Sequence, residues 1–401
     1  MSSASSLPTW DLPELTRAPQ VEAAAGFASP GVEAIFYRGL PWRGRPTRVF
    51  AWMGWPVMTG KRPVPAMVLV HGGGGTAFPQ WVGLWNRRGY AALAMDTCGC
   101  TWGGEHGNRP RHADGGPPGS GGYDQLDEQM HDQWMYHAVA NVMLAHSLLA
   151  SQPRIDAARI GLTGISWGAV IACIAAGVDP RFALVAPVYG CGFLERTHSY
   201  RQRLVTQGPE KMARWSALWD PSHYLPRARA PMLWVSSAHD GHFDLPPLCA
   251  SAKLPGAPGA PGAPGAPGVP GVPGMLSIQI GMLHGQEQGA APKEIRDFAA
   301  NIFKGGPPLP RIVAQEATGR HLRVRYDTAT PVQRAELNYT TDGGEWGERR
   351  WVAVLAHHDE RECVVEAEAP ADATAWYINL VDPRHRLVSG DVAMAPAMAL
   401  P

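Results

Sequence analysis

Ser166 stands in the run Gly164-Ile165-Ser166-Trp167-Gly168, which has the pattern G-x-S-x-G. An apolar segment with strand character precedes this run, and a small-residue segment with helical character follows it, as the motif requires. In that context the chain turns sharply from a strand into a helix, and the serine hydroxyl is raised above the sheet. The glycines leave room for neighbouring elements, and the helix N-terminus favours the negative charge of a developing oxyanion. Ser166 is therefore predicted to be a catalytic nucleophile.

A serine nucleophile needs a base and an acid that orients the base, and the expected chain order is serine, acid, histidine. Asp240 follows an apolar strand segment and is the predicted acid. Asp244 is the second choice, because the acid usually lies at the first turn after the strand. His284 follows the next strand segment, Met275–Met282. We expect His284 to take the proton of the serine and return it to the leaving alcohol, while Asp240 fixes the tautomer of the imidazole.

A second run with chemical meaning is Val68–Gly75, in which an apolar strand ends in His71 and four glycines. Loops of this H-G-G-G type expose backbone N–H groups to the oxygen of a substrate. The predicted donors of an oxyanion hole are the N–H of Trp167 and those of Gly73 and Gly74, between which the sequence does not choose. A phosphate-binding loop is the weaker alternative, because neither G-K-[ST] nor G-x-G-x-x-G is present. His71 is predicted to be structural and to hold the loop.

The remaining histidines and cysteines do not have the spacing of a metal site. His239 and His242 flank the predicted acid without a third ligand, so a structural role is the favoured interpretation. Cys98 and Cys100 are too close together for an ordinary zinc pair, and six cysteines do not make a disulfide framework in a chain of 401 residues. Neither a metal nor a cofactor is expected.

Continuous apolar runs alternate with segments of helical spacing, which predicts an α/β fold with a mostly parallel sheet flanked by helices. The principal strand runs are Pro65–Val70, Ala91–Asp96, Phe182–Tyr189, Pro231–Ala238 and Met275–Met282. The Gly- and Pro-rich stretch 97–122 is predicted to be a long loop at one sheet end. It should frame the acyl and alcohol pockets together with residues 195–226, a candidate lid that carries Trp215, Trp219 and Tyr224.

The pattern changes near residue 305, and the rest of the chain consists of short alternating runs separated by turn residues. This predicts a compact antiparallel β-sandwich, immunoglobulin-like in size. The predicted organisation is an N-terminal extension (1–33), an α/β catalytic domain (34–304) and a β-sandwich domain (311–401). Trp346 and Trp351 are expected to be exposed and to hint at ligand binding, with a core role for at least one as the alternative.

Glycine occupies every third position of the Pro-Gly-Ala repeat at 255–274, as in collagen. The repeat has too few triplets to form a triple helix and lies between the predicted acid and base. It is interpreted as a surface loop with polyproline II character that is dispensable for activity.

The composition excludes several classes of function. The formal net charge is zero, which argues against nucleic-acid and anionic-membrane binding. No stretch is long and apolar enough for a membrane span, and no signal peptide is visible at the start, so a cytoplasmic protein is expected. The oligomeric state is left open.

With the serine motif, the glycine loop, Asp240 and His284 in this order, the chain resembles the α/β-hydrolase superfamily over residues 34–304. It is similar to acetylxylan-esterase and dienelactone-hydrolase-like bacterial enzymes of the prolyl-oligopeptidase clan. The subgroup rests on F-Y-R-G-L-P-W-R-G-R-P-T-R-V-F-A-W, the D-Q-W-x-Y start at Asp132–Tyr136 and P-V-Y-G-C-G-F-L. The added sandwich is similar to that of PhoPQ-activated pathogenicity-related proteins.

The resemblance implies hydrolysis of an acyl ester through an acyl-Ser166 intermediate, with an acetylated carbohydrate or another small ester as substrate. Two alternatives stay open. A serine peptidase of the same clan would need a group that recognises a peptide terminus, and none is evident near the motifs. A non-catalytic binding protein on the same fold is disfavoured by the complete set of serine, acid, histidine and oxyanion glycines.

Overall fold

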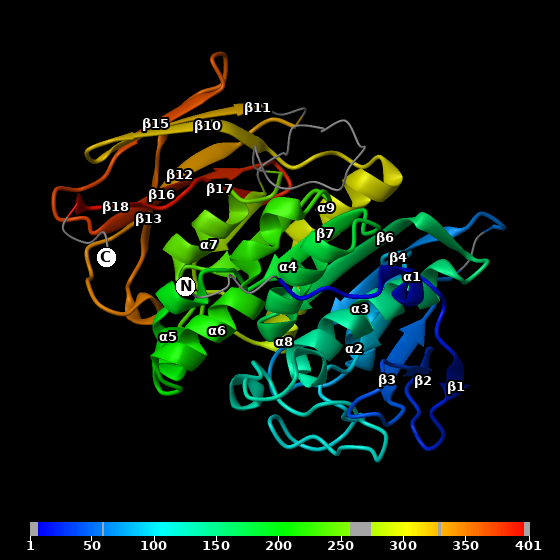
Figure 1. The fold of residues 1–401 in the computed structure, drawn as a ribbon. Coiled ribbons are helices and arrows are strands. Elements are labelled where there is room, and N and C mark those ends of the chain that lie inside the picture. Colours follow the sequence, from blue (N-terminus) through cyan, green and yellow to red (C-terminus); the bar gives the residue numbers. More distant parts are fainter. Residues whose placement is uncertain (1–6, 58–59, 257–273, 328–329, 397–401) are drawn as a thin grey trace.

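The computed structural model describes residues 7–57, 60–256, 274–327 and 330–396. Its centre is a sheet whose first part has the strand order β1-β2-β3-β5-β4-β6-β7-β8-β9 (Figure 1). These strands are β1 (Val21–Ala23), β2 (Val32–Arg38), β3 (Arg48–Gly54), β4 (Val64–Val70), β5 (Ala91–Met95), β6 (Ile155–Ile165), β7 (Leu184–Val188), β8 (Leu233–Ser237) and β9 (Met275–Gln279). The pairs from β5 through β9 are parallel, whereas β1, β2 and β3 form an antiparallel edge.

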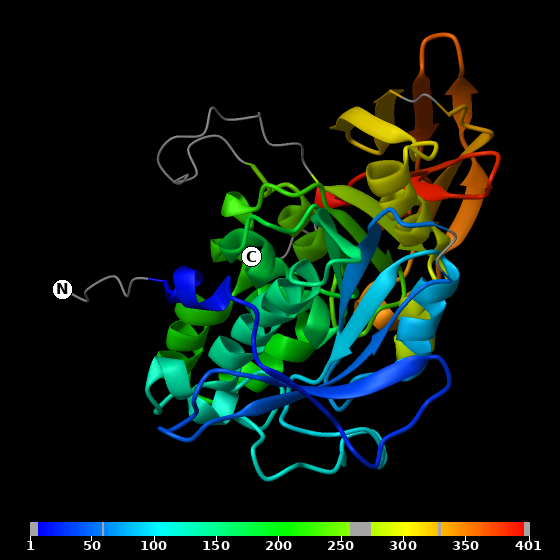
Figure 2. The same ribbon diagram turned by 90° about the vertical axis from the view of Figure 1, so that its right-hand side faces the viewer.

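Helices cover both faces of this sheet. They are α1 (Leu12–Leu15), α2 (Pro79–Arg87), α3 (Trp134–Ala150), α4 (Trp167–Val178), α5 (His198–Val205), α6 (Pro209–Trp219), α7 (Leu245–Ala252), α8 (Gln286–Ala290) and α9 (Lys293–Lys304). The green helices α3 and α4 pack on one face, and α2 and α9 lie on the opposite face (Figure 2). The inner strands are buried on both sides, as their unbroken apolar runs predict. The predicted α/β fold is thus confirmed.

The C-terminal strands form the predicted β-sandwich. They are β10 (Arg311–Thr318), β11 (His321–Asp327), β12 (Arg334–Thr340), β13 (Val352–Leu355), β14 (His357–Asp359), β15 (Val364–Glu368), β16 (Ala375–Val381), β17 (Leu387–Ser389) and β18 (Ala393–Met394). One layer has the order β10-β11-β15-β14 and the other β17-β16-β12-β13, with β18 on β16. A separate apolar core, which includes Leu322, Val324, Leu337 and Ile378, fills the space between the layers.

The sandwich is joined to the central sheet, which the sequence did not reveal. Strand β17 pairs antiparallel with β9 through Ser389 and Leu276, so one layer of the sandwich continues the catalytic sheet. At the other end of the sheet, β1 from the N-terminal extension pairs with β2. The domain boundaries at 33/34 and 304/311 therefore stay predictions.

The expected exposure of Trp346 and Trp351 is wrong. Their exposed fractions are 4% and 8%, and both belong to the large apolar core rather than to a binding surface. Their rings stack with centroids 6.2 Å apart, and Trp351 also packs edge-on against Tyr377. The core role considered as the alternative applies to both.

Residues 257–273 of the Pro-Gly-Ala repeat lie outside the described residues, so the interpretation of the repeat is not tested. Among the residues that the structure does describe, no helix combines the length and the apolar character needed to cross a membrane.

Candidate active site

Ser166 occupies the turn between β6 and α4 with φ +56° and ψ −119°, a strained conformation for a residue with a side chain. Both flanking glycines are required sterically. A Cβ on Gly164 would lie 2.1 Å from the carbonyl oxygen of Gly168, and one on Gly168 would lie 2.1 Å from that of Val70. The backbone of the motif is thus packed directly against its own helix and the neighbouring strand, which leaves the serine at the edge of the sheet.

The structure brings His284 and Asp240 together. Nδ1 of His284 lies 2.7 Å from Oδ2 of Asp240, and the other carboxylate oxygen accepts the N–H groups of His242 and Phe243, each at 2.8 Å. Asp240 is 2% exposed. Tyr189 stacks on the imidazole with centroids 4.6 Å apart. The carboxylate is therefore fixed by three hydrogen bonds, one of which orients the histidine ring.

Asp244, the second choice for the acid, lies elsewhere in the same loop. Its carboxylate accepts the backbone N–H of His198 at 2.9 Å. Burial raises the pKa of Asp244 to about 6. The geometry therefore favours Asp240 as the partner of the histidine, because Asp244 serves the start of α5.

The glycine loop lies beside the serine turn. A Cβ on Gly73 would stand 2.7 Å from Cδ1 of Trp167, whereas one on Gly74 would meet His106 at 2.8 Å. Within the described part of the chain, the N–H groups of Gly73, Gly74 and Trp167 donate to no protein acceptor. Gly75 is different, because its N–H donates to the carbonyl of Gly72 at 3.1 Å. Of the two candidate glycines, Gly73 is the nearer to Trp167.

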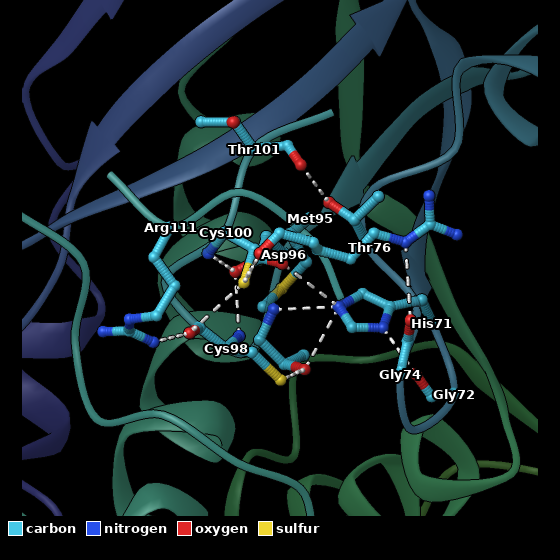
Figure 3. A network of polar contacts seen from close by, with 12 residues as sticks. His71, Gly72, Gly74, Thr76, Met95, Asp96, Cys98, Cys100, Thr101 and Arg111 are labelled. Atoms are coloured by element: carbon cyan, nitrogen blue, oxygen red, sulfur yellow. Dashed lines mark hydrogen bonds and ion pairs between the residues drawn. The ribbon is translucent and has the colours of Figure 1, made fainter. Parts of the chain in front are cut away.

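His71 holds the glycine loop, as predicted. Its Nδ1 donates to the carbonyl oxygen of Gly72 at 2.7 Å, and its Nε2 accepts the N–H of Thr97 at 3.0 Å (Figure 3). A backbone N–H can only donate, so this contact assigns the proton of the neutral imidazole to Nδ1. Asp96, next to this histidine in Figure 3, accepts the N–H groups of Cys98 and Cys100. Two loops at the sheet edge are thereby tied together.

A cavity of about 610 Å³ opens over Ser166. Its wall comes from the glycine loop, the 97–122 loop, α5 and the segments around His242 and His284. The lining residues are Gly72, Gly73, Gly74, Gly75, Phe78, His106, Ser120, Ile165, Ser166, Trp167, Tyr200, Arg203, His242, His284, Gly285 and Gln286. The long loop and residues 195–226 do frame the pocket, as predicted. The aromatic residues singled out in the second segment do not line it: Trp215, Trp219 and Tyr224 are buried in the core.

Tyr200 is the residue of this cavity that sequence reasoning missed. Its side chain lines the cavity together with Ser166, and the ring packs edge-on against Trp167 with centroids 5.2 Å apart. The residue is 3% exposed, and burial is the main reason that its pKa is raised. No motif surrounds Tyr200. The one available signal is that Tyr200 and Arg203 are three residues apart on a helix, which places both side chains on the same helix face.

The side chains weighed as metal ligands have protein partners. Nδ1 of His239 accepts the N–H of Gly281 at 3.2 Å, and Nδ1 of His242 lies 3.1 Å from the hydroxyl of Ser199. Over the described residues, no three histidine, cysteine or acidic side chains are arranged to hold a metal ion. Cys98 donates to the carbonyl of Gly119, and burial raises its pKa to about 12, so it is an inert structural thiol.

The strand order and the strained serine turn at the end of β6 define a protein with the α/β-hydrolase fold. Residues 27–202 match the family model of acetyl xylan esterases. The matched segment is less than half of the chain; it contains the glycine loop and the serine turn and ends before Asp240. The match and the fold indicate a carboxylic ester hydrolase.

Solved structures with this fold include two acetyl xylan esterases. The enzyme from Paenibacillus sp. R4 is 23% identical, with 58% of this chain and 81% of that chain covered and a TM-score of 0.43. Acetyl xylan esterase 1 from Thermoanaerobacterium sp. JW/SL YS485 is 15% identical, with 69% and 88% covered and a TM-score of 0.49. A puromycin-hydrolyzing peptidase of Mycobacterium tuberculosis is 18% identical, with 71% and 42% covered and a TM-score of 0.49. None of the curated protein sequences compared with the chain matches it significantly.

Proposed function

We propose that the protein hydrolyses small carboxylic esters, acetyl esters first among them, through a covalent acyl-Ser166 intermediate. The observation that carries this proposal is the 2.7 Å contact between His284 and Asp240 at the cavity that Ser166 lines. Acetylated carbohydrate is the substrate class that the name of the matching family suggests.

In the proposed reaction, Oγ of Ser166 attacks the ester carbonyl carbon while Nε2 of His284 takes the hydroxyl proton. The tetrahedral intermediate carries its negative charge on the former carbonyl oxygen, which accepts hydrogen bonds from the N–H groups of Trp167 and Gly73 or Gly74. Collapse breaks the bond to the alcohol oxygen, and His284 returns the proton to that oxygen. Water then attacks the acyl-enzyme in the same way and releases the acid.

Asp240 keeps the proton of the neutral histidine on Nδ1, so that Nε2 is free to act as the base. Tyr200 adds a hydroxyl-bearing side chain to the wall of the cavity. We assign to it the role of holding Oγ of Ser166 before attack and of donating to the alcohol oxygen as the ester bond breaks. This role differs from that of the oxyanion donors, because it concerns the leaving group.

The first experiment is active-site labelling with a fluorophosphonate. We expect stoichiometric labelling of the wild-type protein and no labelling of Ser166→Ala. A melting temperature of Ser166→Ala equal to that of the wild-type protein would show that the variant is folded. Absence of labelling of the wild-type protein would contradict the proposal and favour a binding protein on this fold.

The second experiment separates the esterase from the peptidase alternative. p-Nitrophenyl acetate and a series of longer acyl esters are compared with aminoacyl-p-nitroanilides at equal concentration. We expect turnover of the acetyl ester and none of the anilides; the reverse preference would favour the peptidase. A screen over acetylated sugars then identifies the alcohol.

A further inference from the structure

The C-terminal sandwich contacts the two segments that carry Asp240 and His284. One contact is made by the loop 341–351, which joins β12 to β13, and lies on the acid loop 238–244 between β8 and α7. The other is made by β16 and β17 and lies on β9, the strand that leads to His284. The sandwich therefore reaches the acid and the base from one side, while the serine turn belongs to the catalytic sheet alone.

On the acid side, two glycine backbones meet. A Cβ on Gly347 would lie 2.8 Å from Cα of Gly241 and 3.2 Å from its nitrogen, and Gly241 directly follows Asp240. Real Cβ atoms do not approach backbone this closely, so a side chain at position 347 requires one of the two loops to shift, whereas a Cβ on Gly241 would meet nothing within 4 Å. A shift of the loop 341–351 toward Gly241 would push on the peptide next to the carboxylate.

The loop 341–351 is itself well held. Trp346, on one side of Gly347, is buried and stacks on Trp351. The guanidinium of Arg349 lies over the Trp346 ring at 3.9 Å and donates to the carbonyl of Gly344 through Nε and Nη2. Buried aromatic packing and charge-assisted hydrogen bonds of this kind give a stiff support.

On the base side, buried hydrogen bonds join the sandwich to β9. The hydroxyl of Ser389 accepts the N–H of Ile278 at 2.7 Å and donates to Oδ1 of Asn379 at 2.6 Å. The amide of Asn379 donates to the carbonyl of Ile278 at 3.5 Å. Ser389 is 4% exposed and Asn379 is 1% exposed. Strand β9 would be the edge of the catalytic sheet without these partners, and an edge strand is the least restrained part of a sheet.

Helix α9 completes the attachment. Glu294 accepts the N–H of Leu387 at 3.1 Å with one oxygen and the amide of Gln279, the last residue of β9, at 3.3 Å with the other. Arg386 and Asp297, both buried, form an ion pair at 2.5 Å. Buried polar contacts thus join the sandwich, α9 and the end of β9 to one another.

From these contacts we infer that the sandwich is a positioning element of the active site, which holds the acid loop and the end of β9 at the spacing that the His284–Asp240 contact requires. The inference rests on the proposed function of these two residues. A sandwich that only covered the catalytic sheet would affect stability alone. A positioning element also affects the rate, because small misplacements of catalytic groups cost far more than the contacts that prevent them.

The test uses the full chain with Gly347→Ala, which places a methyl group against Gly241. We expect kcat for p-nitrophenyl acetate to fall by roughly 10- to 100-fold, as for catalytic groups displaced by about 1 Å, with KM within about twofold. The matched control is Val324→Ala, which removes methyl groups from the inner core of the sandwich, away from both loops. It should lower the melting temperature and leave kcat at the wild-type value.

A second variant, Ser389→Ala, probes the base side and keeps the inference falsifiable if Gly347→Ala does not fold. It removes the acceptor of the Ile278 N–H, and we expect kcat to fall by about tenfold, the size of one buried hydrogen bond. The downfield proton resonance of the His284–Asp240 hydrogen bond gives an independent reading. It should broaden or shift in Gly347→Ala and Ser389→Ala and stay unchanged in Val324→Ala.

Wild-type kcat and an unchanged resonance in folded Gly347→Ala, or in Ser389→Ala, would overturn the inference. The inference would also be overturned if Val324→Ala lost as much kcat as Gly347→Ala and Ser389→Ala at an equal loss of stability. The rate would then depend only on the stability of the sandwich and not on where it is weakened. Failure of the wild-type protein to react with a fluorophosphonate would instead refute the proposed function, so the two failures are distinguishable.

Discussion

The two halves of the candidate site are supported in different ways. The serine half, made of the glycine loop and the serine turn, is held inside the catalytic sheet by glycines at contact distance and by the buried imidazole of His71. The acid–base half consists of the Asp240 loop and the end of β9. It is contacted by sandwich residues such as Gly347 and Ser389, which follow it in the chain by about a hundred positions. The family match covers the first half and stops before the second. Local motifs specify the serine half, whereas long-range packing specifies the other.

The substitution with the largest expected effect on kcat is Asp240→Asn, in the acid–base half. We expect kcat to fall by about 10⁴-fold with little change in KM, because an asparagine there favours the wrong tautomer of the histidine. The matched variant is Asp244→Asn, in the same loop, whose carboxylate accepts only the N–H of His198 among the described contacts. It should cost less than about tenfold in kcat. Steady-state kinetics on p-nitrophenyl acetate decide, and the opposite ranking would make Asp244 the acid.

The support of the serine half is tested by His71→Phe, which keeps an aromatic ring and removes the hydrogen bonds of the imidazole to the Gly72 carbonyl and to the N–H and hydroxyl of Thr97. The buried N–H of Thr97 then has no acceptor, and such an orphaned group costs about 1–3 kcal/mol. We expect the free energy of unfolding in urea to fall by that amount and kcat to fall with it as the glycine loop loosens. An unchanged unfolding free energy would show that the loop does not depend on His71.

The contrast between the halves explains what could be predicted from sequence. The strands and the mostly parallel sheet follow from apolar runs. Ser166, the glycine pair Gly73 and Gly74, and His71 follow from short motifs whose geometry is local. Tyr200 could not be found this way, since its place in the cavity wall beside Ser166 depends on where α5 packs in the folded protein. The burial of Trp351 was missed for the same reason. It stands in the alternating run Arg350–Leu355, which predicts a sandwich strand with an open face, and only the packing of the sandwich on the catalytic core covers it.

Tyr200→Phe extends the comparison to the cavity wall. Loss of one hydrogen bond of about 1.4 kcal/mol corresponds to about a tenfold fall in kcat. If the hydroxyl assists the leaving alcohol, the loss should be larger for an alkyl acetate than for p-nitrophenyl acetate, whose leaving group needs little help. Tyr123→Phe is the control, because Tyr123 also packs edge-on against Trp167 but does not line the cavity. Equal losses for both esters would place the hydroxyl at the oxyanion instead.

The smallest expected effect concerns the ion pair between Glu345, in the loop 341–351, and His198, at the start of α5, which join at 2.9 Å. Their side chains are 54% and 42% exposed, so solvent screens the pair and it contributes about 0–1 kcal/mol. Glu345→Gln should therefore change kcat by less than about threefold, like Glu348→Gln three residues further on. A loss of kcat as large as that of Gly347→Ala would indicate that this surface pair, and not the buried contact between Gly347 and Gly241, holds the acid–base half in place. The salt dependence of kcat would then separate the two, because only a surface pair weakens as ionic strength rises.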